Sequence, residues 1–347
     1  MTPPSPPPAA PDQLLLLRGV SRSFYLSIRL LPPPLREPIA VAYLLARATD
    51  TVADTTGLPA PQRLVQLQVL GLAIEGYSKA REAIPALAAS FSALQQDPAE
   101  TALIQALPQC LAWLDALGPA DRADVREVLR KITHGQMLDV ERFGDGGALQ
   151  ALADAQELHG YTYLVAGCVG EFWTTLCQRH LAGFATLQAQ RMLELARDYG
   201  MGLQLVNILR DLPADLAAGR CYLPRDELAA AGLTPQDLLR ESALAAPLQA
   251  RWRGEAARKL VAGMDYALAV NSRRVRAASA LPALLGARTL ALLAQPQALG
   301  QRVKVPRSEV RAMALRLALG LAGRSTLTAM SRALRAAARD ADGTIGP

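Results

Sequence analysis

Two pairs of aspartates have the spacing of a helical metal site. Asp50 and Asp54 lie in "ARATDTVADT", and Asp211 and Asp215 lie in "LRDLPADLAA". On an α-helix, residues four apart differ by about 40° around the axis, so each pair projects from one face. The apolar run "IAVAYLLA" before Asp50 indicates an inward-facing stripe, where ionised carboxylates are costly without a counter-charge. A hard divalent cation such as Mg²⁺ would supply that charge, held by few carboxylates and by water or phosphate oxygens.

Polar residues near the second pair add groups that bind oxygen ligands and anions. Gln204, Asn207 and Asp211 are spaced three and four apart, so they line one stripe of the same predicted helix. Amide groups suit water and phosphate oxygens, and Arg210 and Arg220 are available for anions. Two such acidic helices could clamp metal ions around a diphosphate.

Each of these features also has a purely structural explanation. Aspartates four residues apart are common on solvated helices, and Arg47, three residues before Asp50, would then merely pair with it. Tyr43 and Tyr161 lie among apolar residues, where they would be core tyrosines with satisfied hydroxyl groups. Spacing alone leaves both explanations open.

Four longer blocks carry a resemblance to a known family, and they keep their order and separation across about 200 residues. The chain resembles the squalene and phytoene synthase family in "SRSFYLSIRLLP" (21–32), "YLLARATDTVAD" (43–54), "YTYLVAGCVGEFW" (161–173) and "QLVNILRDLPADLAAGRCYLP" (204–224). The resemblance implies a single all-α isoprenoid synthase bundle around a deep apolar channel. It also implies one aspartate-rich helix on each side of the channel mouth.

The resemblance assigns roles residue by residue. It implies that Mg²⁺, which grips the substrate diphosphate, is held by Asp50, Asp54, Asp211 and Asp215. It implies that substrate is bound by Ser21, Ser23, Phe24, Arg47, Gln204, Asn207, Arg210 and Arg302. It implies that catalysis involves Tyr161, Tyr43 and Arg47.

The second acidic block departs from the family pattern. Pro213 stands where many relatives have glycine, and Ala214 replaces an acid often found beside the last aspartate. Proline removes a backbone donor and crowds the carbonyl four residues earlier, so we expect a kink or a helix end near Leu212. In "VAGCVGEFW", Gly167 and Gly170 either permit close helix packing or make room for a long prenyl chain.

The implied reaction is Mg²⁺-dependent prenyl transfer, in which two prenyl diphosphates are joined head to head. Squalene synthases reduce the rearranged cation with hydride from NADPH, whereas phytoene synthases lose a proton. "ATDTVAD" and "VKVPR" favour conversion of farnesyl diphosphate to squalene through presqualene diphosphate. "GRCYLP" and Ala278, where reductive eukaryotic enzymes carry an aromatic pair, favour phytoene synthesis from geranylgeranyl diphosphate. A presqualene diphosphate synthase, a class I terpene cyclase or chain-elongating prenyltransferase, and a non-catalytic helical scaffold also stay open.

Helical periodicity recurs along almost the whole chain, and no alternating β-branched run is evident, so the predicted fold class is all-α. "TPQD" at 234–237 predicts a capped helix start, and "GDGG" at 144–147 predicts a short helix break within one domain, 13–347. The predicted helices span 13–31, 35–55, 61–79, 80–94, 98–117, 120–143, 148–179, 184–216, 225–231, 235–242, 247–274, 281–294 and 308–340.

Composition bears on where the protein works and on what it binds. Residues 1–12 hold six prolines and lack the basic start and apolar centre of a signal peptide, so we expect a disordered arm and a cytoplasmic protein. No apolar stretch is long enough for a membrane span, although an apolar product suggests peripheral contact with the inner face of a membrane. The four cysteines indicate reduced thiols, and the net charge of +6 favours anionic partners such as prenyl diphosphates. With only 5% aromatic residues, nucleic acid is not expected; the oligomeric state is left open, a monomer included.

Overall fold

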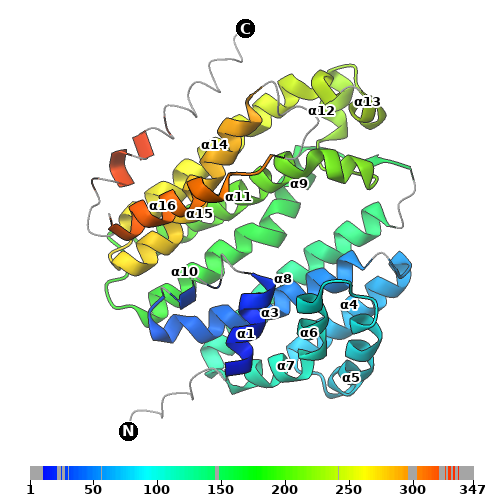
Figure 1. Cartoon of the computed structure of the whole chain (residues 1–347), viewed down its shortest axis with the longest axis vertical. Helices are drawn as coiled ribbons and strands as arrows, with labels where there is room; N and C mark the ends of the chain where they lie inside the picture. Colours follow the sequence, from blue (N-terminus) through cyan, green and yellow to red (C-terminus); the bar gives the residue numbers. More distant parts are fainter. Residues whose placement is uncertain are drawn as a thin grey trace. The chain divides into compact units, whose positions relative to one another are not determined.

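The chain is all-α, as predicted. The computed structural model describes residues 11–21, 25, 28–29, 31–55, 57–144, 148–240, 242–295, 303–319, 325, 327–329, 331–332 and 335. Helices dominate these residues, and the strands among them form one two-stranded parallel sheet (Figure 1). The chain divides into two compact units, residues 1–145 and 146–347. The division falls inside the "GDGG" stretch, and a single domain over 13–347 stays a prediction.

The first unit is built around the long helix α3, which contacts α8 most extensively. The C-terminal half of α3 is almost entirely buried, including Leu44, Leu45, Ala48 and Val52. This core fixes the position of the first aspartate pair at the end of α3. The helices of this unit are α1 (Pro11–Val20), α3 (Pro33–Asp54), α4 (Ala60–Glu75), α5 (Ser78–Ser92), α6 (Pro98–Gln105), α7 (Leu107–Ala116) and α8 (Pro119–Phe143).

The second unit is built around α11, whose most extensive contact is with α14. The strands β1 (Gln150–Ala151) and β2 (Arg220–Cys221) pair next to the end of α11. The helices of this unit are α9 (Ala155–Thr162), the π-helix η1 (Tyr163–Gly167), α10 (Cys168–His180), α11 (Ala189–Ala217), α12 (Arg225–Ala230), α13 (Pro235–Arg240), the 3₁₀-helix η2 (Ser242–Ala245), α14 (Ala246–Ala269), α15 (Arg273–Leu293) and α16 (Arg307–Leu319).

Helix ends follow local capping chemistry where the sequence carries it. The predicted start at Pro235 is confirmed, because the Asp237 carboxylate accepts hydrogen bonds from the Thr234 N–H and hydroxyl, both 2.7 Å. The predicted helix over 98–117 is wrong as one piece and divides at Ala106. Pro108 lies in the first turn of α7, where its missing N–H and its ring prevent continuation from α6.

The prediction of one helix over 148–179 is also wrong. Residues 150–151 form β1, and α9 begins only after Asp154, whose Oδ1 accepts from the Glu157 N–H at 2.9 Å. A two-residue strand is too short for alternation to reveal it in a sequence. The helix end expected near Leu212 does not occur, since α11 runs through Pro213 to Ala217.

Glycines bring the backbones of η1 and α10 into direct contact with α11. A Cβ at Gly170 would lie 2.0 Å from the Ala196 carbonyl oxygen, and one at Gly200 would lie 2.2 Å from that of Ala166. A Cβ at Gly167 would lie 2.9 Å from the Met201 side chain. Of the two explanations for Gly167 and Gly170, close helix packing is therefore what the structure supports.

The remaining global expectations concern thiols and membranes. Cys110, Cys168, Cys177 and Cys221 are free and buried, and burial raises the pKa of Cys110 and Cys177 to about 12. Such thiols carry almost no thiolate near neutral pH. Of the helices in the described part of the chain, none is both long and apolar enough to cross a membrane.

Candidate active site

The polar residues of α3 occupy one stripe of a helix that is otherwise buried. Tyr43, Arg47 and Asp50 are half-buried and Asp54 is exposed, whereas most other positions from 41 to 53 are buried. The spacing of these four residues, 4, 3 and 4, places them along one face. This stripe, the first acidic face, is thus the side of this part of α3 that presents charged groups.

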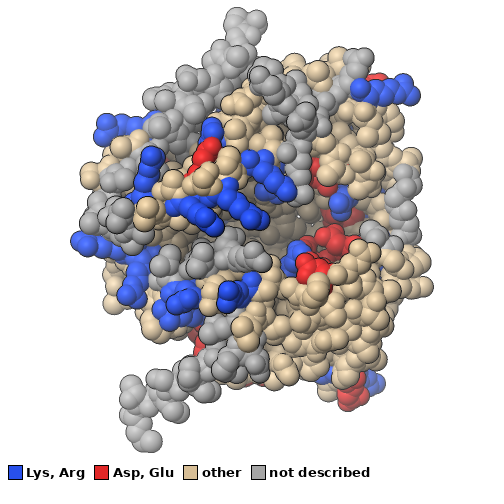
Figure 2. All heavy atoms as spheres, in the orientation of Figure 1, with Lys and Arg blue, Asp and Glu red and all other residues tan. Residues whose placement is uncertain are grey.

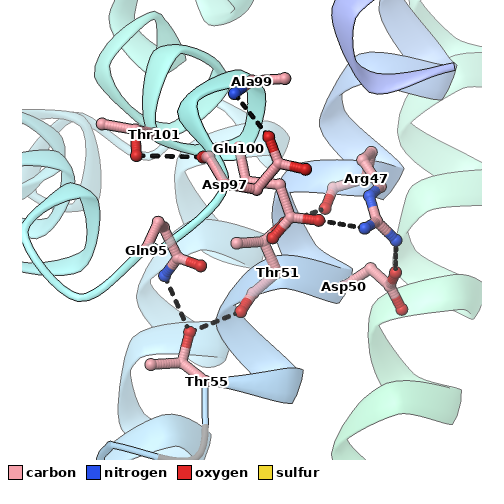
Figure 3. Close-up of polar contacts among 9 residues, drawn as sticks. All are labelled: Arg47, Asp50, Thr51, Thr55, Gln95, Asp97, Ala99, Glu100 and Thr101. Carbon is pink, nitrogen blue, oxygen red and sulfur yellow. Dashed lines mark hydrogen bonds and ion pairs between the residues drawn. The ribbon is translucent and has the colours of Figure 1, made fainter.

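Arg47 lies between two carboxylates on the first acidic face (Figure 3). Its Nη1 donates to Asp50 Oδ2 at 2.5 Å, and its Nη2 donates to Glu100 Oε1. The side chains of Arg47, Asp50 and Glu100 are 35%, 39% and 23% exposed. The pairing of Arg47 with Asp50 that the sequence left open is therefore present, and a second, distant carboxylate shares the guanidinium.

The Asp50 carboxylate is short of positive charge in spite of Arg47. Burial and the neighbouring Asp54 raise the pKa of Asp50 from its ordinary 3.8 to about 6, with a smaller contribution from Glu100. Arg47 acts in the opposite direction but does not outweigh them. Since ionised Asp50 is held at a free-energy cost, the first acidic face is a place where an added cation would be stabilised.

Short polar contacts fix the surroundings of this group. Asp97 Oδ1 accepts from the Ala99 N–H at 2.8 Å and so caps α6, which places Glu100 in the first turn of that helix. Gln95 Nε2 donates to Thr55 Oγ1 at 3.1 Å, just past the end of α3 (Figure 3). The ends of α5 and α3 and the start of α6 are thereby joined around Asp50.

Tyr43 lies one turn before Arg47 on the same stripe. Burial raises the pKa of Tyr43, and a side-chain hydrogen bond with Ser21 partly offsets that rise. The structure therefore brings together Ser21, Tyr43 and Arg47, three residues that the resemblance assigns to substrate binding or catalysis. Their roles stay predictions, and the satisfied hydroxyl fits a core tyrosine at position 43 equally well.

The second acidic face lies on α11 and has a different charge balance. Arg210 donates to both oxygens of Asp211, from Nε at 3.2 Å and from Nη2 at 2.5 Å. Arg220 Nη2 lies 3.2 Å from Asp215 Oδ1. Each aspartate of this pair thus has its own arginine.

The amides predicted to line the same stripe of α11 are in contact with each other. Asn207 Nδ2 donates to Gln204 Oε1 at 3.4 Å, a weak hydrogen bond. Both side chains are half-buried, like Arg210, Asp211 and Asp215. The stripe of polar positions expected from the sequence is therefore present on this helix.

Tyr161 is positioned by Tyr222, a residue of "GRCYLP" to which no role was assigned from the sequence. Its ring stacks on Tyr222, with 5.0 Å between centroids and 21° between planes. Tyr222 is buried and directly follows β2, which β1 holds in place by parallel pairing. Immediately after Tyr161, the π-helix η1 interrupts the α-helical ladder, a feature often found beside functional sites.

The carboxylates of the first acidic face fit an open magnesium site, in which the protein supplies only some of the ligands. Within the described residues, no three His, Cys, Asp or Glu side chains converge as a closed metal cage. Mg²⁺ is bound through one or two carboxylates while waters and phosphate oxygens complete its coordination, so a closed cage is not required. The raised pKa of Asp50 is the observation that supports a cation at this place.

Some predicted residues lie outside the described part of the chain, and others were missed. Ser23, Phe24 and Arg302 fall on residues that the structure does not describe. Glu100 was missed because 53 positions separate it from Arg47; the only local signal is "DPAE" at 97–100, which predicts a capped helix start. Tyr222 was missed because its importance is its stacking on Tyr161.

Charged side chains are unevenly distributed over the surface. On the face drawn in Figure 2, Lys and Arg side chains are widely spread, whereas Asp and Glu side chains gather in a few places. This agrees with the net charge of +6. A net positive charge favours the approach of anionic ligands.

Comparison with known proteins places the chain in a family. The family model "Squalene/phytoene synthase" matches residues 17–309. A bifunctional lycopene cyclase/phytoene synthase of Phaeosphaeria nodorum is 29% identical over 232 residues, which cover 66% of this chain and 36% of that protein. Squalene synthase ERG9 of Saccharomyces cerevisiae is 29% identical over 220 residues, which cover 61% of this chain and 44% of that protein. The chain thus spans less than half the length of these curated relatives.

A solved structure supports the same placement at the level of the fold. A complex of TcSQS with the ligand BPH1237 matches with a TM-score of 0.69 and 21% identity, covering 93% of this chain and 92% of that one. At this identity the likeness shows a shared all-α fold. The family model matches residues 17–309 of the 347, which is most of the chain. The chain therefore belongs to the squalene/phytoene synthase family.

Proposed function

We propose that the chain is a Mg²⁺-dependent prenyltransferase that joins two farnesyl diphosphates head to head and forms squalene through presqualene diphosphate, with NADPH as reductant. The observation that carries the proposal is the first acidic face, where Arg47, Asp50 and Asp54 project together from a buried helix. Family membership agrees with it, since relatives named squalene synthase and phytoene synthase both match the chain.

The proposed roles follow from the chemistry of each side chain. Asp50 and Asp54 would hold Mg²⁺ on the first acidic face, and Asp211 and Asp215 would hold it on the second. Bound Mg²⁺ would act as a Lewis acid that stabilises the charge on the departing diphosphate. Arg47 donates to phosphate oxygens, and a guanidinium suits two such oxygens at once. Allylic diphosphate loss leaves a carbocation, and the apolar surroundings predicted for the prenyl chain keep water away from it.

Tyr161 is proposed to act beside the reacting carbons. Its stacking on Tyr222 keeps the ring in one orientation, so its hydroxyl has a defined position. Gln204, Asn207 and Arg210 are proposed to line the diphosphate subsite on α11. Tyr43 is proposed to support Arg47, one turn away on the same stripe.

Phytoene synthesis is the second candidate function, and it needs no nicotinamide cofactor. In this reaction two geranylgeranyl diphosphates are joined without reduction, and a relative with phytoene synthase in its name favours it. A product that remains presqualene diphosphate is the third.

One assay separates these reactions. Purified protein is incubated with Mg²⁺ and either farnesyl or geranylgeranyl diphosphate, with and without NADPH, and the product is identified by mass. Squalene formed only with NADPH supports the proposal. Phytoene formed from the C20 substrate regardless of NADPH replaces squalene synthesis with phytoene synthesis. If neither substrate is consumed, the prenyltransferase assignment is wrong.

The apolar product of either reaction suggests where the enzyme works. We propose peripheral contact with the inner face of a membrane, which would receive the hydrocarbon as it leaves. Co-sedimentation with lipid vesicles tests this, and protein that stays in the supernatant at low salt contradicts it.

A further inference from the structure

Glu100 is the carboxylate that neither the sequence motifs nor the family resemblance assigns to the site. It lies on α6, 53 residues from Arg47, and it accepts a hydrogen bond from Arg47 Nη2. Its side chain is only 23% exposed. Glu100 lies in the first turn of α6, where its side chain faces Arg47 of α3 (Figure 3).

Both terminal nitrogens of the Arg47 guanidinium donate to carboxylates in the protein without ligands. One terminal nitrogen donates to Asp50 and the other to Glu100, and within the described part of the chain the buried Nε has no acceptor. The orientation of the guanidinium is therefore set by its two ion pairs. A phosphate group that binds Arg47 must compete with these two carboxylates for its N–H groups.

The charge around Arg47 opposes an anion. Two carboxylates, Asp50 and Glu100, pair with the one guanidinium of Arg47, and the nearby charge of Asp54 raises the pKa of Asp50. A diphosphate that approaches this group meets net negative charge, whereas a divalent cation is attracted. With a cation at Asp50 and Asp54, the local charge is no longer negative. The Asp50 oxygens then bind the cation, and this competes with their hydrogen bond from Arg47.

We propose that Glu100 is a positioning residue that, together with Asp50, keeps Arg47 from diphosphate until a divalent cation is bound at Asp50 and Asp54. The inference rests on the proposed function and deepens it, because it gives the order in which the site is filled: metal first, diphosphate second. Arg47 Nη2 stays on Glu100 before and after the cation binds. Arg47 Nη1, which now donates to Asp50, is the nitrogen that changes its acceptor to a phosphate oxygen.

The test is calorimetric titration with inorganic diphosphate, with the protein either chelator-treated or saturated with Mg²⁺. The wild-type chain is expected to bind about 100-fold more tightly with Mg²⁺ than without it. Glu100→Gln removes one negative charge and leaves Arg47 a neutral acceptor. Its metal-free affinity is expected to rise about tenfold, equivalent to about 1.4 kcal/mol, while its affinity with Mg²⁺ changes less than about threefold.

A matched control separates this role from the stability of α6. Asp97→Ala removes the cap of the same helix without touching the Arg47 contact, and it is expected to lower the melting temperature but keep the wild-type metal dependence. Glu100→Asp serves if Glu100→Gln does not fold. It keeps the charge but is one methylene too short to hold Arg47, and its metal dependence is also expected to weaken.

Three results overturn the inference. The first is a metal-free diphosphate affinity of Glu100→Gln that equals that of the wild type. The second is a rise of about tenfold in the metal-free affinity of Asp97→Ala, as expected for Glu100→Gln. The third is weaker binding by Glu100→Gln when Mg²⁺ is present, which would mean that Glu100 aims Arg47 at the ligand instead of withholding it. Hydrocarbon formation is measured separately, so failure of turnover with the expected calorimetry rejects the proposed function alone.

Discussion

Replacing Asp50 with asparagine should stabilise the metal-free protein while abolishing turnover. The pKa of Asp50 is raised from 3.8 to about 6, so the folded protein binds this proton more tightly than the unfolded chain does. Stability therefore falls as the pH rises from about 4 to about 6, and the full penalty is present above pH 6. Asparagine cannot ionise, so Asp50→Asn removes the penalty.

The size of the stabilisation follows from the pKa shift of Asp50 and from the exposed fraction of its side chain. A rise of about two pKa units corresponds to about 3 kcal/mol for a fully buried group. Because 39% of the Asp50 side chain is exposed, solvent screening reduces the figure to about 1 kcal/mol, or about 2 °C in melting temperature for a chain of this size. The lost ion pair with Arg47 offsets little, since Glu100 still accepts from that guanidinium.

Thermal unfolding in chelator-treated buffer measures the difference. Asp50→Asn should melt higher than wild type at about pH 7.5 and nearly equal to it at about pH 3, since Asp50 is largely protonated there in both states. Adding Mg²⁺ should raise the melting temperature of the wild type but not of the variant. Asp115→Asn, at an exposed carboxylate that accepts from Arg81 and Arg126, should show no gain. A variant less stable than wild type at about pH 7.5 would refute the claim that ionised Asp50 is held at a cost.

Three further expectations follow from the same structure. Gly170→Ala should lower the free energy of unfolding by about 3 kcal/mol, because its Cβ meets the Ala196 carbonyl. Gly160→Ala, with open space around its Cβ, should be neutral or stabilising. Equal melting curves for the two variants would contradict this expectation. Tyr222→Leu should lower kcat about fivefold through loss of the Tyr161 stack, and Tyr222→Phe should restore it; an unimpaired leucine variant would reject the positioning role. Chelation with EDTA should abolish turnover and Mg²⁺ restore it, whereas activity that persists after chelation would remove the metal from the proposal.

The helical period alone correctly predicted the stripes that carry the candidate site. On α3 the positions of Tyr43, Arg47 and Asp50 are half-buried while their neighbours are buried, as the spacing requires. Such a stripe depends only on residues one turn apart, so a local pattern contains it. Long, strongly periodic segments were therefore predicted best.

Contacts between distant segments were not predictable in this way. The Glu100 carboxylate reaches Arg47 across 53 positions, and β1 pairs with β2 across about 70, with two residues in each strand. The π-helix η1 was equally hidden from the sequence, and its Ala166 backbone lies against Gly200 on α11, 34 positions away. Pro213 shows the converse: local chemistry predicted a kink or an end, and the end does not occur because α11 continues to Ala217.

The unequal charge balance of the two acidic faces gives them unequal chemistry. On α11, Asp211 pairs with Arg210 and Asp215 pairs with Arg220, so these four charges balance. On α3, Arg47 is shared by Asp50 and Glu100 while Asp54 adds further negative charge, so that face attracts a cation before it can bind an anion. In the proposed mechanism, neutralising an aspartate would therefore have opposite effects on diphosphate binding: on α11 it would release a guanidinium for phosphate, and on α3 it would remove a group that holds the metal.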